Sequence, residues 1–189
     1  MNTIIQHFSR KGEDYNFYLK ELKKYELNLD EITWHIVTKD RAAQNGVKDT
    51  MEWLATNDHP FNSGVVSGLI THCCNQNQIE NAKKIFKKAK KEQVDLKSSI
   101  FLPFIQYYLR IDEPEKAMRF LNKMKSKNIK PNIKIFNTFL SYYGSKNDYK
   151  KGYEIIQNLK EENIKILPYT RNLIGNMKEG IKKQIDEFF

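Results

Sequence analysis

The side chains of this chain that could do chemistry form neither a metal site nor a catalytic cluster. The run HCC at residues 72–74 brings three metal-ligand side chains together in sequence. Neighbouring residues of a helix point in different directions, whereas a zinc ion needs its ligands at one point, so this spacing is wrong for a metal. Asp112, Glu113 and Glu115 flank a proline, which is typical of a helix start. We therefore expect no enzyme, no metal and no cofactor.

Positive charge is the chemical feature that remains. The 189 residues carry a formal net charge of +9, which favours an acidic partner, most often a nucleic acid. Lysines are most concentrated in NAKKIFKKAKKEQ, residues 81–93, at helical positions opposite an apolar stripe that contains Ala82 and Phe86. The candidate basic residues of this helix and of later helices of the same kind are Lys83, Lys84, Lys87, Lys88, Lys91, Lys116, Arg119, Lys123, Lys150 and Lys151.

The elements that position these lysines recur with a fixed period. SGVVSGLI begins at residue 63, SSIFLPFI at residue 98 and IKIFNTFL at residue 133, so successive starts are 35 residues apart. A second register holds only small residues, which allow two helices to approach closely: Ala82, Ala117 and Gly152. A gapless period of this length predicts a solenoid.

Each unit is expected to contain two helices. In the unit 98–132 these are IFLPFIQYYLR and PEKAMRFLNKMKSK, and the motif KPN at residues 130–132 closes the unit because proline disfavours a continuous helix. Asn77, Asp112 and Asn147 share a register and have side chains that favour helix starts. We therefore expect them to cap the second helix of their units.

The sequence thus predicts a single all-α solenoid. Its expected parts are a partial repeat 1–30, repeats 31–62, 63–97, 98–132 and 133–167, and C-terminal capping helices 168–189. The corresponding helix breaks are expected near Asp30, Asn62, Lys97, Asn132 and Leu167. The repeat 31–62 is three residues shorter than the others, and we expect LATNDHPFN to replace its usual last turn.

The two ends of the array are apolar, although solenoid ends normally need polar caps. We expect partner proteins to cover them, unless the short terminal helices fold back and cap the array themselves. The end residues in question are Ile4, Ile5, Phe8, Phe188 and Phe189. No stretch approaches the ~18 apolar residues of a membrane-spanning helix, so no membrane span is expected.

A helix pair of 35 residues that ends in NIKPN and restarts with IKIFNTFL resembles the pentatricopeptide repeat family. The similarity is strongest over residues 63–167, where NTFLSYYGSKNDYKKGYEIIQNLKEENI follows the family consensus nearly throughout. The resemblance implies a right-handed α-solenoid, a mitochondrial matrix location and binding of single-stranded RNA. In such proteins each repeat can read one base with two or three side chains.

The resemblance also implies where base-reading side chains would lie, namely at the fifth and the last residue of each unit. These pairs are His35 with Asn62, Ser67 with Lys97, Leu102 with Asn132, and Asn137 with Leu167. The family combines Thr, Asn or Ser at the first position with Asp, Asn or Ser at the second. None of the four pairs fits this pattern fully, so the base-reading positions are interpreted as degenerate.

By the same resemblance, the first helix of each unit lines a concave groove and the second helix lies on the convex side. The groove positions are expected to be exposed and nearly neutral: Ser67, Thr71, Cys74, Leu102, Gln106, Leu109, Asn137, Ser141 and Gly144. The lysines belong to the second helices. They form either an ordinary solvated surface or a face that contacts the phosphates of folded RNA.

Together these features favour a non-catalytic subunit of a mitochondrial ribonucleoprotein, in the first place the mitochondrial ribosome. Such a subunit would hold ribosomal RNA and neighbouring proteins by shape and charge, and would take no small-molecule substrate. The first alternative is a free organellar factor that binds single-stranded RNA for transcript processing or stability. The second is a protein-only scaffold in another large mitochondrial complex.

Overall fold

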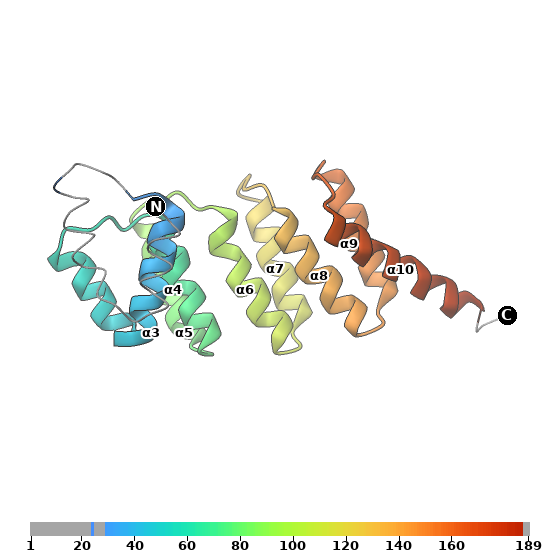
Figure 1. Cartoon of the computed structure of the whole chain (residues 1–189), viewed down its shortest axis with the longest axis horizontal. Coiled ribbons are helices and arrows are strands. Elements are labelled where there is room, and N and C mark those ends of the chain that lie inside the picture. Colours follow the sequence, from blue (N-terminus) through green and yellow to red (C-terminus); the bar gives the residue numbers. More distant parts are fainter. Residues whose placement is uncertain (1–23, 25–28, 187–189) are drawn as a thin grey trace. The chain divides into compact units, whose positions relative to one another are not determined.

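The computed structural model describes residues 24 and 29–186, with side chains through Gly180. This part of the chain contains helices and no strand, as the all-α prediction requires (Figure 1). The expected helix before Asp30 and all five apolar end residues lie outside the described residues. The helices are α3 (Glu31–Thr56), α4 (Ser63–Asn75), α5 (Ile79–Lys91), α6 (Ser98–Arg110), α7 (Pro114–Lys125), α8 (Ile133–Ser145), α9 (Tyr149–Glu161) and α10 (Pro168–Asp186).

A helix begins directly after each of the five expected break residues. Three of these residues cap the helix that follows, because their side-chain oxygen accepts a hydrogen bond from the amide three residues later. The distances are 2.7 Å for Asp30, 3.0 Å for Asn62 and 3.2 Å for Asn132. The helix α8 therefore starts two residues after Pro131, and the chain is not helical through the proline.

The expected role of Asn77, Asp112 and Asn147 as helix caps was wrong. These residues have φ values of 58°, 62° and 54°, so they form the left-handed turns that end α4, α6 and α8. The caps of the following helices are the next residues along, and among these only Asp148 uses its side chain, on the amide of Lys151. Asn and Asp suit both roles, because their short polar side chains also tolerate the left-handed region.

A second set of left-handed turns has the 35-residue step, at Asp58, Gln93, Asn128 and Asn163. The turn that closes the first unit is thus in step with the others, and the expectation that LATNDHPFN replaces it was wrong. The residues that this repeat lacks are missing before the closing turn, in its second helix. Gly46, with φ 85° and ψ 164°, interrupts α3, and only 12 residues separate it from Asp58 (58 − 46), against 16 from Asn77 to Gln93 (93 − 77). The second helix of this unit is therefore shortened.

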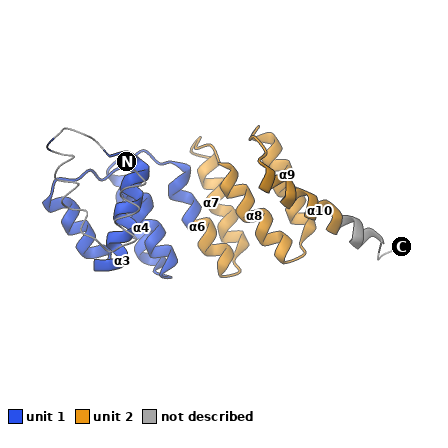
Figure 2. Ribbon diagram, in the orientation of Figure 1, with its two compact units in different colours: residues 1–103 blue, residues 104–189 orange. Residues whose placement is uncertain are grey.

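The chain divides into two compact units, residues 1–103 and 104–189 (Figure 2). In the first, α4 packs against both α3 and α5 and is buried over its first eight residues. A side chain at Gly64 would place its Cβ 2.2 Å from the backbone oxygen of Glu31. At Gly68 it would lie 2.1 Å from Thr38 Oγ1. The two glycines therefore let α4 lie directly on α3.

In the second unit, α8 contacts both α9 and α10. Its core-facing side chains Phe136, Phe139 and Leu140 are fully buried. Between α9 and α10, a Cβ on Gly152 would meet Met177 Sδ at 2.5 Å, so a side chain at this position would have to displace the side chain of Met177. None of the described helices is both long and apolar enough to cross a bilayer.

Candidate nucleic-acid interface

The second base-reading positions are largely committed to contacts within the chain. The side chains of Asn62 and Asn132 cap α4 and α8. Lys97 Nζ binds both carboxylate oxygens of Glu31, each at 2.8 Å, and this hydrogen bonding raises the pKa of the Lys97 ammonium. Leu167 is exposed, but its side chain has no hydrogen-bonding group for a base edge.

The first base-reading positions are also poorly placed for bases. Ser67 is 1% exposed, and its hydroxyl donates to the backbone oxygen of Ser99 at 3.0 Å. His35 Nδ1 lies 3.0 Å from the same hydroxyl and must donate to it, because the hydroxyl proton is already used. Leu102 is apolar. Half-buried Asn137 is different, since its Oδ1 accepts no hydrogen bond from the described residues.

Three of the expected groove positions do not line a groove. Ser67, Cys74 and Leu109 are 1%, 1% and 5% exposed, so the expectation that they face solvent was wrong. For Ser67 the reason is contact with the neighbouring repeats, since its hydroxyl bonds His35 of α3 and the backbone oxygen of Ser99 in α6. Gln106 and Ser141 are exposed as expected.

The residues 72–74 lie in the core. Burial raises the pKa of the Cys73 thiol to about 11 and lowers the pKa of His72. Cys74 is also buried, and neither cysteine forms a disulfide with a described residue. A buried neutral thiol is a poor ligand and a poor nucleophile. Across residues 29–180, no three His, Cys, Asp or Glu side chains converge as a metal site would require.

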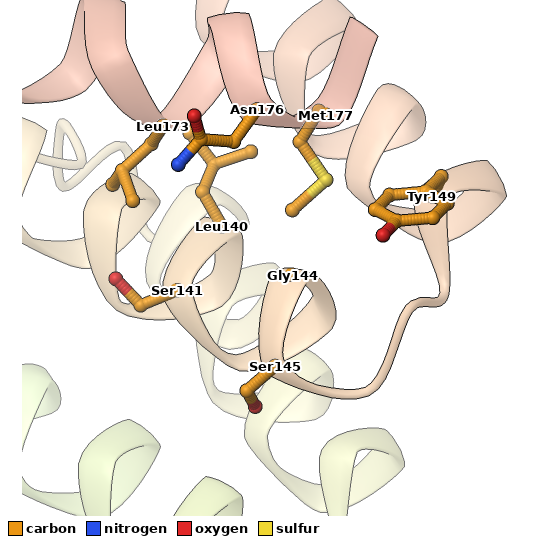
Figure 3. Close-up of a pocket in the computed structure, with 8 residues that line it drawn as sticks. All are labelled: Leu140, Ser141, Gly144, Ser145, Tyr149, Leu173, Asn176 and Met177. Carbon is orange, nitrogen blue, oxygen red and sulfur yellow. The ribbon is translucent and has the colours of Figure 1, made fainter. Parts of the chain in front are cut away.

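One cavity of about 260 Å³ opens between α8, the start of α9 and α10. Figure 3 shows α10 side chains reaching towards α8 across it. Its lining has no acidic or basic side chain and its volume is below the usual range for small-molecule sites, so we assign no chemistry to it. The lining residues are Leu140, Ser141, Gly144, Ser145, Tyr149, Leu173, Asn176 and Met177.

The strongest concentration of charge lies on α5. Six lysines of this helix are exposed, and we call them the α5 basic face: Lys83, Lys84, Lys87, Lys88, Lys90 and Lys91. Lys90 was missed in the sequence, although it follows Lys87 by three residues and so shares its side of the helix. The opposite stripe is buried: Ala82, Ile85, Phe86 and Ala89. There the ring of Phe86 packs edge-on against Phe101 at 5.5 Å between centroids.

Within the part of the chain that the structure describes, most lysines of the α5 basic face have no carboxylate partner. Lys83 pairs with Glu80 at 2.7 Å and Lys88 with Glu92 at 2.5 Å, both within the helix. The other four lysines have no carboxylate within 4 Å among the described residues: Lys84, Lys87, Lys90 and Lys91.

The basic residues of α7 and α9 are partly neutralised by contrast. Lys116 pairs with Glu113 at 2.7 Å and Lys151 with Glu115 at 3.2 Å. Lys123 lies over the ring of Phe120. Arg119 and Lys150 are exposed. The two helices thus present a mixed surface, whereas α5 presents a nearly uniform positive one.

The chain belongs to the pentatricopeptide repeat family, an all-α class of repeat solenoid. A family model described as "Pentatricopeptide repeat-containing protein" matches residues 63–175, which is more than half of the chain. No curated protein matches it.

Solved structures of this family share the fold. The pentatricopeptide domain of Arabidopsis thaliana protein-only RNase P 1, in complex with tRNA, has a TM-score of 0.62 and 14% identity over 94% of this chain and 96% of its own. PPR10 in complex with an 18-nt psaJ RNA element has a TM-score of 0.66 and 15% identity over 93% of this chain. PPR10 from maize has a TM-score of 0.63 and 11% identity over 98% of this chain. The chain covers only 27% and 33% of these two PPR10 chains.

Proposed function

We propose that this protein is a non-catalytic, RNA-binding subunit of a mitochondrial ribonucleoprotein, in the first place the mitochondrial ribosome. It holds RNA by its phosphates, through the α5 basic face. The observation that carries the proposal is the set of four exposed α5 lysines that have no carboxylate partner among the described residues. Phosphate contacts need such cations and carry no sequence information.

The base-reading positions support binding to the backbone over binding to bases. Ser67 is buried and bonded to His35 and Ser99, and Lys97 is paired with Glu31. A side chain that must break an internal contact before it reaches a base gains little from that base. Sequence-specific reading along this chain is therefore unfavourable.

The family supports RNA as the partner and the mitochondrion as the compartment. Two of the three structural neighbours described above were solved with tRNA and with an 18-nt RNA element. The mitochondrial location rests on the family resemblance alone. Neighbouring proteins in the same particle would complete the binding of the RNA.

A free transcript-binding factor is the second candidate, and one observation favours it. Asn137 keeps a carbonyl oxygen that accepts no hydrogen bond from the described residues, at a position where the family reads bases. One such residue could give a preference at a single nucleotide, which is too little to select a transcript. We therefore rank this function below the first.

The test has two measurements. Fluorescence anisotropy with a labelled random-sequence RNA at 50 and 200 mM salt should show binding that weakens steeply with salt and does not depend on sequence. Sedimentation of the tagged chain from a mitochondrial lysate should place it with ribosomal particles, and ribonuclease should release it. A chain that binds no RNA at 50 mM salt but still sediments with a large complex would be a protein-only scaffold, and the proposal would fail.

A further inference from the structure

The six lysines of the α5 basic face form two rows. With 3.6 residues per turn, one row contains Lys83, Lys87 and Lys90, and the other contains Lys84, Lys88 and Lys91. Each row extends about 10 Å along the helix, and the rows are separated by roughly 100° around its axis. Each keeps two lysines without a carboxylate partner among the described residues, namely Lys87 and Lys90 in the first and Lys84 and Lys91 in the second.

The rows are held in fixed positions by the packing of α5. The side chains of Ala82 and Ala89 have no exposed surface, and those of Ile85 and Phe86 are 6% exposed. A helix anchored along its whole apolar stripe cannot turn about its axis, so the direction in which the two rows face is set before any partner binds. The two intrahelical pairs on the face are exposed and weak, and they exchange readily for phosphate contacts.

Two other polyanionic surfaces fit this face poorly. An anionic membrane needs apolar side chains that insert beside the lysines, but the apolar side chains of α5 are buried, apart from half-buried Ile79 at the first residue of the helix. Single-stranded RNA is held by aromatic side chains on which bases stack, but the exposed positions of α5 include no aromatic residue.

We propose that the α5 basic face binds double-helical RNA, with each row of lysines on the phosphates of one strand. This inference rests on the proposed function and names the form of RNA that it takes. A duplex carries two rows of phosphates on a rigid frame, and its A-form minor groove is wide and shallow. A helix about 10–12 Å across, with cations on both flanks, matches such a groove. A single strand has one row of phosphates and would leave one row of lysines unused.

The first experiment compares RNA forms with the full chain. Anisotropy is measured with a labelled 20-base-pair RNA duplex and with each of its strands, the strands being designed not to fold. We expect the duplex to bind at least 10-fold more tightly than either strand at the same salt concentration. Equal or tighter binding of a strand would overturn the duplex inference and leave the proposed function standing. No binding of any RNA would overturn both.

The second experiment removes one row at a time. The variants K87Q/K90Q and K84Q/K91Q each remove two charges, as does the control K160Q/K178Q, whose two exposed lysines lie on other helices. Each row variant should reduce the slope of log K against log salt for the duplex by roughly two, about one for each lost contact. The control should leave the slope unchanged. Loss of slope in only one row variant, or an equal loss in the control, would overturn the two-strand contact.

Discussion

Lys97 and Glu31 lie 66 residues apart in the sequence and form a bidentate ion pair, with Lys97 Nζ 2.8 Å from both carboxylate oxygens. Lys97 is the last residue of the repeat 63–97 and Glu31 is the first residue of the repeat 31–62, so the pair joins neighbouring repeats. Gly64, at the start of the repeat that ends with Lys97, lies against the backbone of Glu31 and leaves no room for a side chain. A position where the family has a base-reading residue is here a structural contact.

The ion pair itself should contribute little to stability. Its two side chains are 47% and 42% exposed, and the attraction within an exposed ion pair is largely screened by water and salt. We expect Lys97→Gln to leave the free energy of unfolding nearly unchanged, as measured by urea denaturation. The matched variant Gly64→Ala should cost more, about 1–3 kcal/mol, because its Cβ meets backbone that cannot move aside. The reverse order would show that the ion pair contributes more to stability than the close contact between α3 and α4.

The second packing prediction concerns Gly152. Its Cβ position lies 2.5 Å from Met177 Sδ, so Gly152→Leu should destabilise the second unit by about 1–3 kcal/mol. Gly175→Ala is the control, because nothing lies within 4 Å of its Cβ position and alanine favours a helix. Thermal melting should therefore show a lower Tm for the first variant and an unchanged or higher Tm for the second. An unchanged Tm for Gly152→Leu would contradict the contact with α10.

Much of this fold could be predicted from the sequence, because residues with specific structural roles recur at the same positions of each repeat. Asn62 and Asn132 mark helix starts by capping them, and the small residue at Gly152 marks a close helix contact. The left-handed turns were missed because Asn77 has a side chain that suits a cap and a turn equally well. The local sequence alone does not distinguish a helix cap from a left-handed turn.

The candidate site is less predictable, because it depends on contacts between distant residues. Nothing near Ser67 in the sequence indicates that His35 and Ser99 occupy its hydroxyl. Most of the α5 basic face could be predicted from the sequence, because helical spacing alone separates its lysines from the buried stripe. Whether a lysine has a carboxylate partner depends on residues that are near it in space. Only the structure therefore identifies the lysines that lack one.

The buried thiols give a prediction about pH. Burial raises the pKa of Cys73 from 9.0 to about 11, so between these values the unfolded chain releases the proton while the folded chain retains it. The unfolded state then binds fewer protons, and the contribution of this group to stability falls as pH rises through that window. We expect the free energy of unfolding to decline from pH 9 to pH 11 more steeply in the parent than in Cys73→Val, as measured by urea denaturation. Equal slopes would show that this thiol is accessible to solvent in the folded state.

The same burial predicts slow chemical modification. At pH 8 both cysteines of the folded chain should react with iodoacetamide far more slowly than in urea, because the thiolate is scarce and the side chains are covered. A Gln106→Cys variant introduces an exposed thiol on α6 and should be modified once per chain under native conditions. Rapid modification of Cys73 or Cys74 in the folded parent would contradict their placement in the core.

Reversing charge on the α5 basic face should separate binding to phosphates from binding to bases. The variant K84E/K87E/K88E/K91E should weaken RNA binding at 100 mM salt by roughly 100-fold or more and should prevent assembly into the parent particle, because four cations that attract phosphate become four anions. The control K127E/K160E/K165E/K178E makes the same change in net charge at exposed lysines on other segments, and it should retain most of the binding.

Asn137→Ala should change the affinity less than 3-fold for any RNA sequence. Asn132 is unsuitable for this comparison, because its loss would remove the cap of α8 as well. Circular dichroism of each variant checks that the helices are intact. If Asn137→Ala instead abolished binding to one RNA sequence while the α5 variant bound normally, the protein would be a transcript-binding factor, and the α5 basic face would be an ordinary solvated surface.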